Sequence, residues 1–167
     1  MITSIKEFTE YWQNHSKATQ KLLAALTDQS LSQKVSESDR TLARIAWHIV
    51  LTIPEMVERT GLKLNEPAPS ASLPRTAQEI LKGYNAVAGS LLEQVEKFWD
   101  DSTLQIEDNM YGQQWKRGLT LEILIDHEIH HRGQMTVLMR QAGLKVPGLF
   151  GPSREEWAEF GGSAPEI

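Results

Sequence analysis

Residues 120–141 read TLEILIDHEIHHRGQMTVLMRQ, and their apolar spacing predicts a helix that Gly143 ends. Positions three and four apart share one face of a helix. On the face predicted to be buried lie three apolar residues and two histidines: Leu124, Met135, Leu138, His127 and His131. Buried imidazoles are costly unless they are hydrogen-bonded or bind a metal. Two imidazoles one turn apart can both bind one transition metal, most simply zinc, so this stretch predicts a core helix and a metal site.

Three further segments show the same helical spacing, at residues 5–26, 40–60 and 76–99. Asp39 is the expected N-cap of the second segment, and Thr76 with Glu79 forms a capping box at the start of the third. Four long amphipathic helices predict an all-α four-helix bundle, and the length of the chain favours a single domain spanning residues 1–167.

The connecting segments are less regular. Residues 62–75 are rich in Pro, Ala and Ser, which predicts a loop. Residues 100–118 fit either an irregular loop or a short extended pair. Near the end, Ser153 with Glu156 predicts the cap of a short extra C-terminal helix that carries Trp157 and Phe160.

Composition narrows the classes of function. The net charge is -5, which argues against nucleic acid as a partner, because phosphate binding usually requires a basic surface. The chain contains no cysteine, so any thiol chemistry needs a thiol substrate. No apolar run has the length of a membrane span or a signal peptide, and we therefore expect a cytoplasmic protein without membrane contact.

A third histidine strengthens the prediction of a metal site. His48 lies on one side of the second predicted helix, together with Thr52 and Glu55. Helix bundles build metal sites from side chains of facing helices, so His48, His127 and His131 are the predicted ligands of one divalent metal. Three protein ligands leave a position open for water or a small-molecule substrate.

The remaining histidines have weaker predicted roles. His130 is rotated by about 100° from its neighbour along the helix, which places it at the rim of the site or against a partner subunit. His15 follows the apolar stripe of the first helix and is a candidate for lining the pocket or contacting the metal ligands. Asp126, Glu128 and Glu55 are candidate hydrogen-bond acceptors for the ligating imidazoles.

Residues 127–131 also satisfy the H-E-x-x-H pattern of zinc metallopeptidases, in which Glu128 would be the general base. The extended metzincin pattern fails, because Leu138 stands where the third ligand would fall. A downstream glutamate from another helix could still supply a third ligand. The metallopeptidase therefore stays open as a lesser alternative.

Several segments resemble the DinB family of bacterial four-helix proteins. They are residues 126–134 (DHEIHHRGQ), 41–48 (TLARIAWH), 142–147 (AGLKVP) and 151–157 (GPSREEW). The resemblance implies an up-down-down-up bundle that is often a homodimer. It also implies a divalent metal, commonly zinc or nickel, held by histidines that match His48, His127 and His131.

Characterised relatives in the wider superfamily include transferases and isomerases that depend on bacillithiol or mycothiol. The resulting hypothesis is a metal-dependent enzyme that transfers such a thiol to a small electrophile, with Glu128 and Glu55 as candidate catalytic residues. The alternative is a non-catalytic protein that binds a metal or a small molecule.

Overall fold

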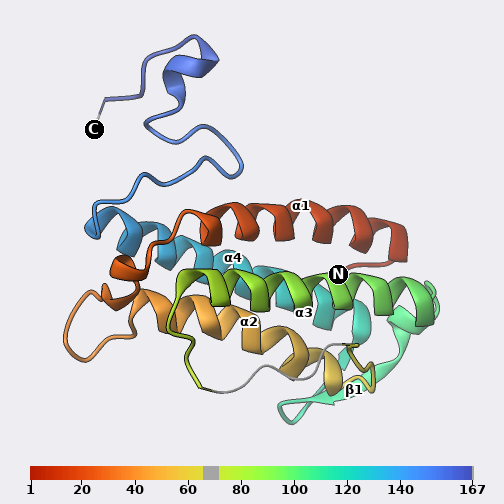
Figure 1. Cartoon of the computed structure of the whole chain (residues 1–167). Helices are drawn as coiled ribbons and strands as arrows, with labels where there is room; N and C mark the ends of the chain where they lie inside the picture. Colours follow the sequence, from red (N-terminus) through yellow and green to blue (C-terminus); the bar gives the residue numbers. More distant parts are fainter. Residues whose placement is uncertain (66–71, 167) are drawn as a thin grey trace.

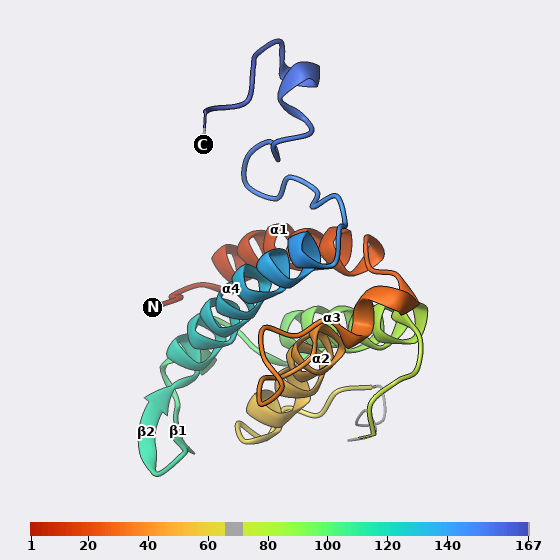
Figure 2. The ribbon, with the colours of Figure 1, turned by 90° about the vertical axis from the view of Figure 1, so that its left-hand side faces the viewer.

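The computed structural model describes residues 1–65 and 72–166, which form four long helices and one small sheet. The helices are α1 (Ile5–Ala24), α2 (Leu42–Glu58), α3 (Ala77–Phe98) and α4 (Arg117–Gln141). They lie side by side, and α1 and α2 each pack against both α3 and α4 (Figures 1 and 2). The prediction of a mainly helical fold is confirmed. The predicted loop 62–75 falls partly on residues 66–71, which lie outside the described part of the chain.

Short polar side chains start the helices, because the first backbone N–H groups have no partner within a helix. The capping box of α3 is confirmed: Thr76 Oγ1 accepts from the Glu79 N–H at 3.2 Å, and the Glu79 carboxylate accepts from the Thr76 N–H at 3.1 Å. The predicted cap of α2 was wrong. The helix begins two residues later than Asp39 implies, and Thr41 Oγ1 accepts from the Arg44 N–H at 3.2 Å.

The core fills the space between the four helices with large apolar side chains. Members that are almost fully buried come from every helix and include Phe8, Trp12, Leu22, Leu42, Ile49, Ile53, Ile80, Leu91, Leu121 and Met135. Full burial of one such aliphatic side chain contributes about 1.5–3 kcal/mol. The Trp12 indole N–H donates to the Ala88 carbonyl at 3.0 Å, which satisfies its one polar atom. Within the described residues, no helix combines the length and the hydropathy that a membrane crossing requires.

Residues 100–118 contain the extended pair that the sequence left as one of two alternatives. Strands β1 (Glu107–Met110) and β2 (Gln113–Lys116) are antiparallel, with Met110 opposite Gln113. The two turn residues both have positive φ, 57° at Tyr111 and 84° at Gly112, as a two-residue type I′ hairpin requires. The short helix η2 (Thr103–Gln105) precedes this hairpin.

Two other 3₁₀ helices flank the bundle. Helix η1 (Asp28–Ser32) follows α1, and the Asp28 carboxylate accepts from the first N–H of α3, at Ala77, over 2.8 Å. The predicted C-terminal helix is present only as the single turn η3 (Trp157–Phe160). The chain around η3 extends away from the bundle beyond α1 and α4 (Figures 1 and 2).

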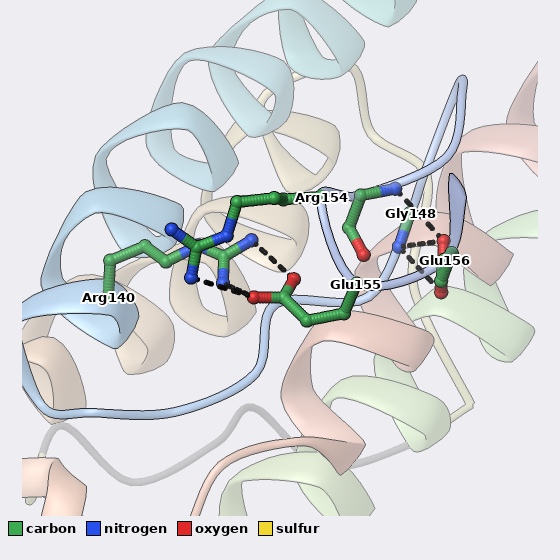
Figure 3. Close-up of polar contacts among 6 residues, drawn as sticks. Arg140, Gly148, Arg154, Glu155 and Glu156 are labelled. Atoms are coloured by element: carbon green, nitrogen blue, oxygen red, sulfur yellow. Dashed lines mark hydrogen bonds and ion pairs between the residues drawn. The ribbon is translucent and has the colours of Figure 1, made fainter. Parts of the chain in front are cut away.

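Polar contacts connect this C-terminal segment to the end of α4 and within itself (Figure 3). The Arg140 guanidinium donates to both oxygens of Glu155, at 2.5 and 2.9 Å. The Glu156 carboxylate accepts from the backbone N–H groups of Gly148 and Ser153, each at 3.0 Å. The acidic side chains of this segment therefore give it a defined local conformation although it buries little apolar surface.

Candidate metal centre

Three histidines from two helices meet between α2 and α4. His48 Nε2 lies 3.1 Å from His127 Nε2, and His131 Nε2 lies 3.1 Å from the same atom. All three ligand atoms lie within 4.8 Å of one another. The four-residue spacing places two of the rings one above the other on α4, and the packing of α2 against α4 brings the third.

The position of His48 follows from the apolar pattern of α2. Ile45, three residues before His48, and Ile49, directly after it, are both buried. This side of α2 therefore packs against the neighbouring helices. One turn further along, the Thr52 hydroxyl donates to the His48 carbonyl oxygen at 2.8 Å. Thr52 thus contacts the backbone of a candidate ligand and is buried beside it, although it supplies no ligand atom.

The donor set suits a divalent transition metal. Nitrogen ligands at about 2.0–2.1 Å from a tetrahedral zinc lie about 3.3 Å from one another. Two of the observed separations are 3.1 Å and all three lie within 4.8 Å, so the rings are already close to that geometry. Imidazole nitrogen is a good ligand for zinc, nickel and copper alike, and three such ligands leave one or more positions open.

The protonation of these rings also favours metal binding. Burial, with the mutual repulsion of the rings as the next cause, lowers the pKa of His127 to about 4. Burial also lowers the pKa of His48, where repulsion from His131 is the next cause, and it is the main cause that lowers the pKa of His131. At neutral pH the three imidazoles are therefore uncharged, which is the state that binds a metal.

The structure adds a residue that sequence reasoning missed. His131 Nδ1 donates to the amide oxygen Oε1 of Gln134 at 2.7 Å, which leaves Nε2 without a proton and directed at the other two rings. The acceptors expected from the sequence are the acidic Asp126, Glu128 and Glu55. The available signal was the i, i+3 spacing of His131 and Gln134, because an amide oxygen accepts a hydrogen bond as a carboxylate does.

Glu128 points into a different environment. Its Oε1 accepts from the Tyr84 hydroxyl of α3 at 2.5 Å, and the side chain is 1% exposed. Its Oε2 has no hydrogen-bond partner among the described residues. Burial raises the pKa of Glu128 and also that of Tyr84. Because Glu128 is next to His127 in sequence, about 100° of helix rotation separates the two side chains.

His15 belongs to the same buried polar region and not to the three-histidine cluster. The Arg132 guanidinium donates to the His15 carbonyl oxygen at 2.6 Å and lies 2.8 Å from His15 Nδ1. The ring of Phe150, from the C-terminal segment, packs 4.9 Å from the His15 ring. Burial and the charge of Arg132 lower the pKa of His15.

The remaining candidates lie at the edge of the site or outside it. Glu55 is exposed, and its carboxylate accepts from Arg59 Nε at 2.8 Å and from the Tyr111 hydroxyl at 2.6 Å. Asp126 is exposed on α4. His130 is exposed and its ring lies 4.9 Å from that of His131, which agrees with a position at the rim.

A hollow of about 430 Å³ opens onto one of the three histidines. His131 and Gln134 line it from α4, and the segment before α2 covers its other side. A larger hollow of about 750 Å³ lies at the end of the bundle where α4 begins, bounded by Trp99 and Arg117. Within the described residues, the only group of three or more potential metal ligands is the histidine cluster, so the smaller hollow is the one that chemistry favours.

Fold and site together define a helical protein with a histidine cluster, and comparison with known proteins identifies its family. The chain belongs to the DinB family, whose sequence model matches residues 1–166. It is 45% identical over 167 residues, the whole of both chains, to the uncharacterized protein YrdA of Bacillus subtilis (strain 168).

Solved structures agree with this family. A DinB-like protein from Bacillus cereus ATCC 10987 superposes with a TM-score of 0.86 and 41% identity, over 90% of this chain and 100% of that one. A DinB-like protein, YjoA, from Bacillus subtilis matches with a TM-score of 0.66 and 16% identity, over 86% of this chain and 97% of that one. The second likeness supports the fold alone.

Proposed function

We propose that this chain is a metal-dependent enzyme in which His48, His127 and His131 bind one divalent transition metal, zinc or nickel. The proposed reaction transfers a low-molecular-weight thiol, of the bacillithiol or mycothiol kind, to a small electrophile. The observation that carries the metal site is the meeting of three imidazole Nε2 atoms, one of them on His131, which lines an open hollow. Family membership supports the thiol reaction, and the absence of cysteine makes the thiol a substrate.

The residues of the chain have separate tasks in this proposal. Gln134 holds the His131 ring with Nε2 directed inward, and burial keeps all three rings uncharged near neutral pH. A divalent metal bound there would lower the pKa of a thiol or water that occupies its open position. In the transfer, the thiol loses its proton, its sulfur forms a bond to carbon, and the leaving group departs with the electron pair.

The position of Glu128 argues against the metallopeptidase alternative. A general base must reach the water that it activates. The Glu128 carboxylate instead accepts from the Tyr84 hydroxyl in the buried region between α3 and α4. A metallopeptidase would also need a further ligand or a water-directed carboxylate on the hollow side. Glu55 remains a candidate for proton transfer, although its present partners are Arg59 and Tyr111.

A non-catalytic protein that binds a metal or a small molecule remains the alternative function. A structural zinc usually has four protein ligands, and the described residues offer three, which favours the enzyme. Thermal unfolding with and without a chelator separates the two functions. Complete loss of the fold on chelation would favour a structural metal, and a shift of only a few degrees would favour a reactive one.

The wider organisation is also part of the proposal. A single domain over residues 1–167 and an up-down-down-up order of the helices agree with the packing of α1 and α2 against α3 and α4. A homodimer is a further part of the proposal. Phe150 and Phe160 of the C-terminal segment are 67% and 70% exposed, and such rings favour contact with a second copy. Light scattering at micromolar concentration tests the dimer. The cytoplasmic location stays a prediction from the sequence.

Elemental analysis of tag-free protein, beside the His48→Ala variant, is the test of the metal site. The expected result is about one divalent ion per chain in the parent protein and none in the variant. Consumption of a thiol in the presence of electrophiles is then compared between the two proteins. Equal metal content in both would refute the assignment of His48.

A further inference from the structure

The hollow beside His131 is lined by four apolar residues, by the polar Gln134 and by one carboxylate and one guanidinium, those of Asp39 and Arg40. Its apolar wall consists of Val35, Ile45, Val137 and Leu138, and Arg40 also lines it. Val35 and Val137 are 66% and 55% exposed, so the wall near the opening is not covered by the chain itself. A space of about 430 Å³ is enough for a small organic molecule.

Arg40 has no partner for its charge in the described part of the chain. Two other arginines differ in this respect: Arg59 pairs with Glu55 at 2.7 Å, and Arg140 pairs with Glu155. Arg44 also has no ion pair among the described residues, but it does not line the hollow. The adjacent carboxylate, on Asp39, accepts instead from the Ser36 hydroxyl at 2.7 Å. The guanidinium of Arg40 is therefore available to a ligand, and its planar fork matches a carboxylate.

Arg40 shares the hollow with the histidine cluster. Arg40 and His131 both line this space. An anion placed between Arg40 and the histidines would thus lie within electrostatic range of both. An apolar body of a few carbon atoms would contact Val137 and Leu138 along the way.

We propose that Arg40 is the residue that selects the ligand of this site, and that the ligand is a small molecule with a short apolar chain and a carboxylate. The carboxylate pairs with Arg40, and the other end of the molecule reaches the position facing the three histidines. A single cation with Asp39 beside it favours a monoanion over a phosphate dianion. The orientation of the ligand in this inference rests on the proposed metal site. The charge of the ligand is inferred from the lining of the hollow alone.

Three thiols of matched size test this proposal: 3-mercaptopropionate, 2-mercaptoethanol and 2-aminoethanethiol. They share an HS–CH2–CH2 unit and end in a carboxylate, a hydroxyl and an ammonium group. Binding to cobalt-loaded protein is followed by the sulfur-to-cobalt charge-transfer absorption. Binding to metal-free protein is followed by ligand-observed NMR. Arg40→Gln is compared with Arg44→Gln, because Arg44 is also exposed at the start of α2 but lies outside the lining of the hollow.

The expected result is a preference for 3-mercaptopropionate over 2-mercaptoethanol that falls about tenfold or more in Arg40→Gln and persists in Arg44→Gln. Because the variants are compared by this ratio, differences in thiol acidity cancel. An unchanged ratio in Arg40→Gln, a preference for 2-aminoethanethiol, or stronger competition by inorganic phosphate than by propionate would each overturn the proposal.

The same experiment separates this inference from the proposed function. If cobalt does not bind, the metal site fails, and the NMR ratio on metal-free protein still decides whether Arg40 selects a carboxylate. If cobalt and all three thiols bind but Arg40→Gln changes nothing, the metal site stands and the role of Arg40 fails.

Discussion

Substituting Gln134 by leucine tests the central geometric argument, because it removes the acceptor of His131 Nδ1 and keeps a side chain of similar size. The 2.7 Å hydrogen bond determines which ring nitrogen carries the proton. Loss of such an outer partner typically weakens metal binding by roughly 10- to 100-fold, or about 1.4–2.7 kcal/mol. We therefore expect a loss of this size in Gln134→Leu, measured by competition with a chelator of known affinity.

Thermal unfolding supplies an independent measure of the same effect. In a fixed excess of free metal, the lost affinity appears as lost stabilisation, and for a chain of this size it lowers Tm by roughly 3–10 °C. Without metal, Gln134→Leu changes stability by no more than about 0.5 kcal/mol, because the residue is exposed. Gln141→Leu, at the exposed end of α4, is the matched control, and Gln134→Glu keeps an acceptor and retains affinity. Metal affinity within twofold of the parent protein in Gln134→Leu would show that the hydrogen bond between His131 and Gln134 does not support metal binding.

Three further predictions concern stability. Because the pKa of His127 is lowered to about 4, and those of the other two cluster histidines are also lowered, the unfolded chain binds protons below about pH 6.5 that the folded chain does not. The urea midpoint of metal-free protein therefore falls between pH 7 and pH 5, and a constant midpoint would contradict this. Tyr84→Phe removes the hydroxyl that donates to Oε1 of the buried Glu128 carboxylate and costs about 1–3 kcal/mol in urea unfolding. An unchanged free energy of unfolding would show that the carboxylate is satisfied otherwise. Gly118→Ala places a Cβ against the backbone carbonyl of Ile2, and we expect it to lower the free energy of unfolding by about 1–3 kcal/mol. A variant as stable as the parent would show that the N-terminal segment moves aside.

Much of the fold follows from local patterns in the sequence. The apolar spacing within each segment predicts four helices, and the structure has them within a few residues of the expected ends. Thr76 and Glu79 illustrate why: a capping box involves only residues three apart, so no distant contact is needed to form it. Asp39 shows the limit of prediction from local patterns. Several polar residues precede α2, and the packing of the loop decides that Thr41 is the N-cap.

The pair His127 and His131 was equally readable from the sequence, because four residues make about one helical turn. The inclusion of His48 was a hypothesis about which face of α2 meets α4, and the structure brings the three rings together.

Tertiary packing alone decided the surroundings of the site. The H-E-x-x-H pattern places Glu128 next to His127, but the contact with Tyr84 of α3 depends on how α1 and α2 hold α3 and α4 around the common core. Arg40 carries no local signal of its role, because its place beside the hollow depends on the path of the segment before α2. Helix periodicity is a local property that the order of residues determines, whereas the partner of a buried charge or the lining of a hollow depends on contacts between residues far apart in the chain.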